Sequence, residues 1–185
     1  MGKQKIILKM AAVVIGFIGL CSFMAVTWKA YSNKYISFNY PDTYMITDEE
    51  MAEDECSLIC EIKGDRNTLS MVRIDIVDFV DELDKSTKEG AILKALSRLE
   101  DDLKDDNLGY YETYQNVVCS KTKKVKKGKF SGYSRAFTAT LVGTPMQGES
   151  FLAFSGNKLL ALFFQADNTT HMDQLNRIVS GIKLK

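Results

Sequence analysis

Histidine is almost missing from this chain of 185 residues, since His171 is the only one. One histidine cannot build a two-histidine zinc site. A Ser/His/Asp triad would have to use His171, yet the chain contains no nucleophile elbow of the form G-x-S-x-G. The sequence therefore predicts that His171 is an ordinary residue at the start of a helix, and it predicts no catalytic residue.

Phosphate-binding glycine loops and calcium-binding loops are also missing. Residues 128–132 (GKFSG) lack both the G-x-x-x-x-G-K-[ST] spacing and a following helix. Residues 48–55 (DEEMAEDE) hold six carboxylates, but they lack the glycine and the alternating ligands of an EF-hand. We expect no cofactor and no metal ion.

Cysteine is scarce, and the four cysteines are Cys21, Cys56, Cys60 and Cys119. If Cys56 and Cys60 lie on one strand, they are about 13 Å apart, beyond the ~7 Å limit between the Cα atoms of a disulfide. Either one can instead pair with Cys119 in an oxidising compartment, and the candidate pair is Cys60 with Cys119. The alternatives are that these cysteines are small buried apolar residues or that one of them is a reactive thiol.

Outside the first thirty residues, basic residues are slightly fewer than acidic residues. Those thirty contain four lysines and no acid, whereas the rest of the chain has 20 basic and 24 acidic groups, a net charge of −4. The lysine run at 121–129 (KTKKVKKGK) has no aromatic residue on which a base can stack. Because nucleic-acid backbones demand positive charge, we expect no nucleic-acid partner.

The longest uncharged run is residues 10–28, which a helix extends to about 28 Å, close to the ~30 Å core of a membrane. Lys3, Lys5 and Lys9 precede this run, so the positive-inside rule places the N-terminus in the cytoplasm. We expect a membrane anchor within residues 1–30. The domain of residues 31–185 then faces the periplasm or the cell exterior.

Three alternatives to the anchor stay open. A signal peptide cleaved near Ala25-Val26-Thr27 would secrete the domain. A lipoprotein signal would use Cys21, although the preceding Leu20 is not the small residue that such a signal has. A buried core helix is the third alternative, and 19 apolar residues are long for it. The first two alternatives export residues 31–185, as the anchor does.

Alternating apolar and polar residues predict most of the strands. In YISFNYP (35–41), Ile36, Phe38 and Tyr40 share one face, and Pro41 ends the strand because it has no amide hydrogen. Residues 48–55 are predicted to be a charged loop or one helical turn, residues 121–129 a basic strand edge or hairpin, and residues 143–148 a connection. The predicted strands are residues 36–40, 44–47, 58–62, 72–76, 110–120, 133–142, 149–155 and 159–165.

Two helices complete the predicted fold. Ser86 and Glu89 form a capping box, and one apolar stripe follows over residues 86–103. A second helix begins at about residue 170. The strand LLALFFQ (159–165) is apolar on both faces, so it needs cover on both sides. Short connections favour antiparallel pairing. The sequence thus predicts an α+β fold, an α-β-α sandwich around one antiparallel sheet, preceded by an N-terminal transmembrane or signal helix.

YISFNYP near an export signal, the order of strands and helix, and the closing RIVSGIKLK (177–185) resemble the PsbP-like family over residues 31–185. One departure is Tyr44, since many members have a tryptophan shortly after the proline. The resemblance implies an α-β-α sandwich and a binding role. Known members include a subunit of the photosynthetic oxygen-evolving complex, a binder of a small GTPase in nuclear import, and exported bacterial proteins. The resemblance supplies no catalytic residues.

These observations predict an exported, membrane-anchored, non-enzymatic binding domain, an accessory component of the cell envelope whose partner is an envelope protein. One alternative is a carrier of a small apolar ligand between sheet and helix, near Tyr110, Tyr111 and Phe137. Another is a hydrolase with an unrecognised site. The surfaces expected to bind the partner are an acidic set, Glu49, Glu50 and Glu53, and a basic set, Lys123, Lys124, Lys126 and Lys127.

Overall fold

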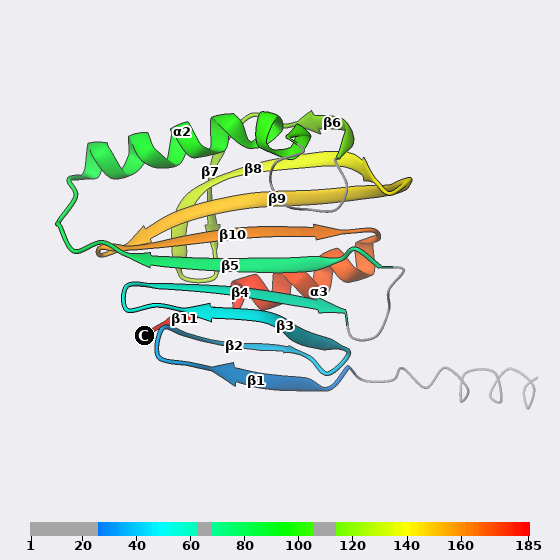
Figure 1. The fold of residues 1–185 in the computed structure, drawn as a ribbon, viewed down its shortest axis with the longest axis horizontal. Coiled ribbons are helices and arrows are strands. Elements are labelled where there is room, and N and C mark those ends of the chain that lie inside the picture. Colours follow the sequence, from blue (N-terminus) through cyan, green and yellow to red (C-terminus); the bar gives the residue numbers. More distant parts are fainter. Residues whose placement is uncertain (1–25, 63–67, 106–113) are drawn as a thin grey trace, which may run out of the picture.

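The computed structural model describes residues 26–62, 68–105 and 114–185 (Figure 1). The expected membrane segment at 10–28 lies outside these ranges except for its last three residues, and so does the alternative lipoprotein site at Cys21. Within the described ranges, no helix is long and apolar enough to cross a membrane. The first strand begins at Trp28, three residues before the predicted domain boundary.

The described elements confirm the α+β class and the two predicted helices. The helices are α2 (Lys85–Lys104) and α3 (Thr169–Ser180). The strands are β1 (Trp28–Ser32), β2 (Ile36–Pro41), β3 (Tyr44–Met51), β4 (Glu55–Ile62), β5 (Met71–Asp78), β6 (Gln115–Cys119), β7 (Lys123–Lys127), β8 (Phe130–Leu141), β9 (Thr144–Ser155), β10 (Lys158–Ala166) and β11 (Lys183–Leu184).

The strands pair antiparallel, as predicted, but they form two sheets instead of one. The large sheet has eight strands in the order β3-β4-β5-β10-β9-β8-β6, with β7 also paired to β8. The small sheet has the order β1-β2-β11. The prediction of a single sheet is wrong because β2 does not pair with its neighbour β3. Its partners are β1, which begins in the segment assigned to the N-terminus, and the distant β11.

Strand β10 is covered on both faces, as its apolar sequence requires. Leu160, Leu162 and Phe164 belong to the same buried cluster as Leu175 and Ile178 of α3. The alternate residues of β10 face the other way, where Leu159 and Ala161 pack against the buried cluster of α2. The helices therefore lie on opposite faces of the large sheet, and the small sheet lies on the α3 side because Ile36 and Phe38 belong to the α3 cluster.

Helix α2 is capped by Asp84 and not by the predicted Ser86. The Asp84 carboxylate accepts a hydrogen bond of 2.9 Å from the backbone N–H of Thr87, and Ser86 donates to the same carboxylate. These bonds hold the pKa of Asp84 far below its usual value. The predicted apolar stripe is confirmed, since four residues of α2 are buried: Ile92, Leu96, Leu99 and Leu103.

Strand β3 is longer than predicted and includes much of the acidic run. Asp48, Glu49 and Glu50 belong to the strand, and the turn is confined to Ala52–Asp54. The prediction of a loop or helical turn at 48–55 is wrong because β3 is an edge strand with exposed positions, where charged residues are tolerated.

The turn between β8 and β9 is also shorter than predicted. Residues 144–148 belong to β9, so only Val142 and Gly143 connect the strands. Both have positive φ, 51° for Val142 and 75° for Gly143, as in the type I′ turn that fits the twist of a hairpin. A β-branched residue rarely adopts this conformation, so Val142 is strained.

Replacing Val142 with Asn should therefore stabilise the protein by about 1 kcal/mol, because Asn tolerates positive φ and Val142 is 57% exposed. Urea unfolding of the two proteins measures the difference. Val118→Asn is the matched control, since Val118 is 66% exposed in strand β6 and is not among the residues with positive φ. It should give no gain. Equal effects at the two positions would contradict the assignment of strain to Val142.

Candidate functional site

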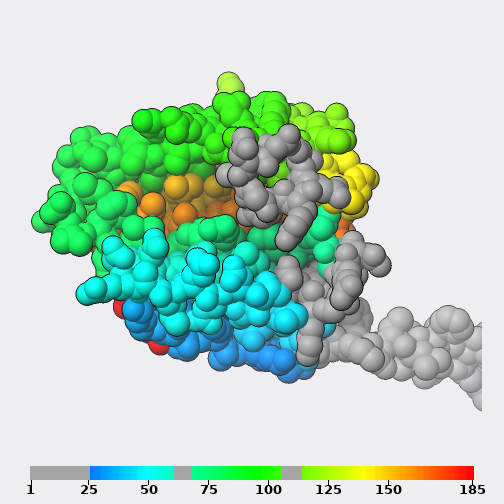
Figure 2. All heavy atoms as spheres, in the orientation of Figure 1, coloured from blue at the N-terminus to red at the C-terminus, as the bar shows by residue number. Residues whose placement is uncertain are grey.

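The face of the large sheet that carries α2 is covered only in part. Helix α2 packs mainly on β6, β8 and β9, and Figure 2 shows this side of the molecule hollowed between the green α2 and the cyan strands, with orange atoms of β10 at the bottom. On β5, the apolar residues Val72, Ile74 and Ile76 are buried on the opposite face. Side chains alternate along a strand, so polar residues of β5 line the open side.

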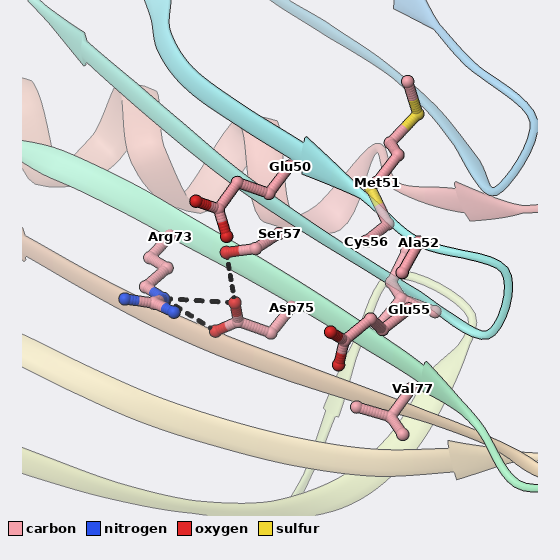
Figure 3. Close-up of a pocket in the computed structure, with 10 residues that line it drawn as sticks. Glu50, Met51, Ala52, Glu55, Cys56, Ser57, Arg73, Asp75 and Val77 are labelled. Atoms are coloured by element: carbon pink, nitrogen blue, oxygen red, sulfur yellow. Dashed lines mark hydrogen bonds and ion pairs between the residues drawn. The ribbon is translucent and has the colours of Figure 1, made fainter.

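An open pocket of about 470 Å³ lies over β3, β4 and β5 (Figure 3). Glu50 of β3, Ser57 of β4, and Arg73 and Asp75 of β5 line it. Ser57 and Asp75 are direct register partners. Ser57 Oγ donates a hydrogen bond of 2.6 Å to Asp75 Oδ1, and Arg73 Nε lies 3.0 Å from Oδ2. These bonds fix the orientation of the Asp75 carboxylate.

A second hollow of about 220 Å³ lies under α2 and meets the first at Asp75. Its lining includes Leu99 and Asp102 of α2 and Phe163 of β10. Asp75 lines both hollows, so they adjoin along the sheet beside α2, and we call the two together the acidic groove. Its charged lining residues are Glu50, Glu55, Asp75, Asp102 and Arg73, a net charge of −3. This lining suits a cationic ligand.

The structure separates the three acidic residues predicted to bind a partner. Glu50 lines the acidic groove. Glu49 points to the other face of the sheet, where its carboxylate accepts a hydrogen bond of 2.5 Å from the Tyr31 hydroxyl. Glu53 lies in the turn after β3, and its carbonyl accepts a hydrogen bond of 2.6 Å from Tyr35. Glu55, which belongs to the acidic run at 48–55 predicted to be a partner surface, also lines the groove, whereas sequence reasoning missed Asp75 and Asp102.

The basic residues are separated in the same way. Lys123, Lys124 and Lys126 are exposed on β7, which confirms the predicted basic strand edge. Lys127 instead forms an ion pair of 2.9 Å with Glu149, and their side chains are only 15% and 18% exposed. Lys127 therefore supports the fold and is not available to bind a partner.

The predicted disulfide between Cys60 and Cys119 is wrong. Cys60 lies on β4 and Cys119 on β6, five strand spacings apart in the large sheet, or roughly 24 Å. Cys56 and Cys60 lie on the same strand and are buried, and no disulfide joins Cys56, Cys60 and Cys119. Burial raises the pKa of the Cys56 thiol, and the hydrogen bond from Asn33 only partly opposes this effect. Cys56 is therefore a buried apolar residue and not a reactive thiol.

A serine, a histidine and an aspartate do meet at the start of α3. Ser70 Oγ lies 3.1 Å from His171 Nδ1, and Asp167 Oδ1 lies 2.7 Å from the same nitrogen. In a catalytic triad the serine and the carboxylate contact different ring nitrogens. Ser70 is also 1% exposed and donates a hydrogen bond to Asp167. The cluster therefore joins β5 to α3 and does not activate a nucleophile.

The aromatic residues proposed to line a ligand pocket do not form one in the described part of the chain. Tyr110 and Tyr111 lie outside the described residues. Phe137 is 3% exposed, stacks on Phe163 at 5.5 Å between ring centroids, and contacts Tyr114 edge-on. In residues 26–62, 68–105 and 114–185, no cluster of three or more His, Cys, Asp or Glu residues has the geometry of a metal site.

Solved structures share this fold. The solution structure of cyanobacterial PsbP (CyanoP) from Synechocystis matches with a TM-score of 0.59 and 12% identity, over 92% of this chain and 100% of that chain. A crystal structure from Bacteroides thetaiotaomicron matches with a TM-score of 0.54 and 11% identity, over 85% of this chain. This chain covers 48% of that protein, about half its length.

Mycobacterium tuberculosis LpqN, a protein involved in cell envelope biogenesis, has a TM-score of 0.49 and 15% identity, over 87% of this chain and 92% of LpqN. No protein-family model matches the chain, and no curated protein matches it in sequence. At these identities the similarity to CyanoP shows the fold alone. The predicted PsbP-like resemblance is confirmed at that level.

The contacts of Asp167 predict a stability loss in acid. Burial opposes ionisation of Asp167, but hydrogen bonds from Thr68, His171 and Ser70 outweigh it and hold the pKa of the carboxyl below its ordinary value. A lowered pKa in the folded state stabilises the protein above the unfolded value of about 3.9, and this contribution is lost as the pH falls through the folded pKa.

Asp167→Asn should therefore destabilise the protein at pH 7 and reduce its loss of stability below about pH 4. Urea unfolding between pH 2 and pH 7 measures both effects. Asp173→Asn, at an exposed position of α3, the helix that Asp167 precedes, is the control and should leave the pH dependence of stability unchanged. If the free energy of unfolding depends on pH in the same way in the wild type and in Asp167→Asn, the assigned contribution of the Asp167 carboxylate is contradicted.

Proposed function

We propose that the protein is an exported, membrane-anchored accessory component of the cell envelope that binds a partner protein in the acidic groove and catalyses no reaction. The observation that carries this proposal is the groove itself. It is an open recess, lined from β3, β4, β5, β9, β10 and α2, that extends from beneath α2 to the part of the sheet that α2 leaves uncovered. Pockets of several hundred Å³ with a few fixed polar groups are typical binding sites.

The polar contacts of the groove favour binding over catalysis. Asp75 is held by Ser57 and Arg73, so its charge is partly compensated and its orientation is fixed. Catalysis needs a nucleophile or base near a group that activates it. The Ser70, His171 and Asp167 cluster has the wrong geometry for that and belongs to the opposite end of β5 from Val77 of the groove.

The location outside the cytoplasm rests on the sequence of the first thirty residues. The uncharged run and the lysines before it support an anchor with the domain on the far side of the membrane. The fold shared with CyanoP is compatible with this proposal and does not identify the partner.

Photo-crosslinking in intact cells tests the proposal. A photoreactive amino acid replaces Glu50, which lines the groove, in the full-length protein, and Asp173 is replaced in the control. We expect a discrete crosslinked protein from position 50 and none from position 173. Protease added to spheroplasts should degrade the domain.

Two results would overturn the proposal. The first is equal crosslinking from positions 50 and 173, which would mean that the groove is not the binding surface. The second is full protection of the domain from protease in spheroplasts that remain sealed, which would place it in the cytoplasm.

A further inference from the structure

We propose that the acidic groove of one copy of the chain docks strand β7 of a second copy. This inference rests on the proposed function, because it names the partner that the groove takes. It is carried by two oppositely charged surfaces of the same molecule: the lining of the acidic groove and the exposed lysines of the edge strand β7.

The groove has negative charge that the described fold does not neutralise. Arg73 is the one cation among its described lining residues, and it pairs with Asp75. Within residues 26–62, 68–105 and 114–185, the carboxylates of Glu50, Glu55 and Asp102 accept no hydrogen bond and form no ion pair. A cationic segment would therefore find three carboxylates to pair with.

Strand β7 has the complementary charge. Lys123, Lys124 and Lys126 are exposed, and among the described strands β7 pairs with β8 alone. Lys124 and Lys126 share one face of the strand, about 6.6 Å apart, with Lys123 on the other. An extended strand with cations at this spacing can lie along a recess whose carboxylates come from neighbouring strands and a helix.

The contact forms between copies and not within one. In the ladder of the large sheet, β10, β9 and β8 separate β5 from β7, so a molecule does not place its own β7 in its own groove. Because the two surfaces differ, the contact is heterologous and links copies head to tail.

A charge-swap experiment tests this contact with two differently tagged full-length copies in one cell. The groove variant is E50K/E55K/D102K, and the strand variant is K123E/K124E/K126E. We expect wild-type copies to co-purify, and each variant to co-purify with itself about tenfold less. The groove variant and the strand variant should co-purify with each other, because the unchanged groove of the strand variant meets the unchanged β7 of the groove variant, and the reversed groove meets the reversed strand.

Two further measurements keep the test independent of whether the variants fold. Co-purification of wild-type copies should be lost in 500 mM salt, which screens exposed charges. A synthetic peptide of residues 121–129 should also reduce the co-purification of wild-type copies, because it competes with β7 for the groove. The same peptide with glutamine in place of its lysines should have no effect.

The proposal is overturned if wild-type copies do not co-purify, if the groove variant and the strand variant do not co-purify with each other, or if the lysine peptide does not reduce the co-purification of wild-type copies. A different protein crosslinked at position 50, with no self-association, would reject this inference and leave the proposed function standing. No crosslinked protein at position 50 and no self-association would reject both.

Discussion

The fold depends on one constraint, the burial of a central strand on both of its faces. Leu160, Leu162 and Phe164 of β10 pack on the α3 side, and Leu159 and Ala161 pack on the α2 side, so each face needs its own cover. On the first face, α3 and the small sheet share this task. On the second, α2 is the main cover. A helix is about 10 Å wide, whereas seven strands side by side span about 29 Å, so α2 leaves some strands open.

The strands that α2 leaves open have polar outer faces, and the acidic groove follows from this arrangement. Ser57 and Asp75 come from two neighbouring strands whose inner faces are apolar, and Glu50 comes from the edge strand beside them. Substitution of the inner residues would damage the core, whereas substitution of the outer residues would disturb few core contacts. The groove thus uses the part of the sheet on which packing places the fewest demands.

A structural feature is predictable from the sequence when the residues that form it are close together along the chain. The alternation of Val72, Ile74 and Ile76 predicts β5, and the stripe of α2 predicts its buried side, because both signals are local. The groove is not predictable in this way, since Ser57, Asp75 and Asp102 meet only through strand register and the docking of α2. Within β5, opposite charges at Arg73 and Asp75 were a local signal of a polar face. The partner of β2 was missed because β11 is formed by residues at the far end of the domain.

The small sheet has a consequence for how the domain folds. Its register pairs Ser37 with Lys183, and the backbone N–H of Lys185 donates a hydrogen bond of 2.9 Å to the carbonyl of Tyr35. Ser37 and Lys183 are 146 positions apart in the sequence, so their pairing closes a very long loop, at a high cost in chain entropy. A nascent chain in which residues 183–185 are not yet available leaves one edge of β2 unpaired. Completion of the native state is therefore a late event, and contacts of such large sequence separation favour slow folding.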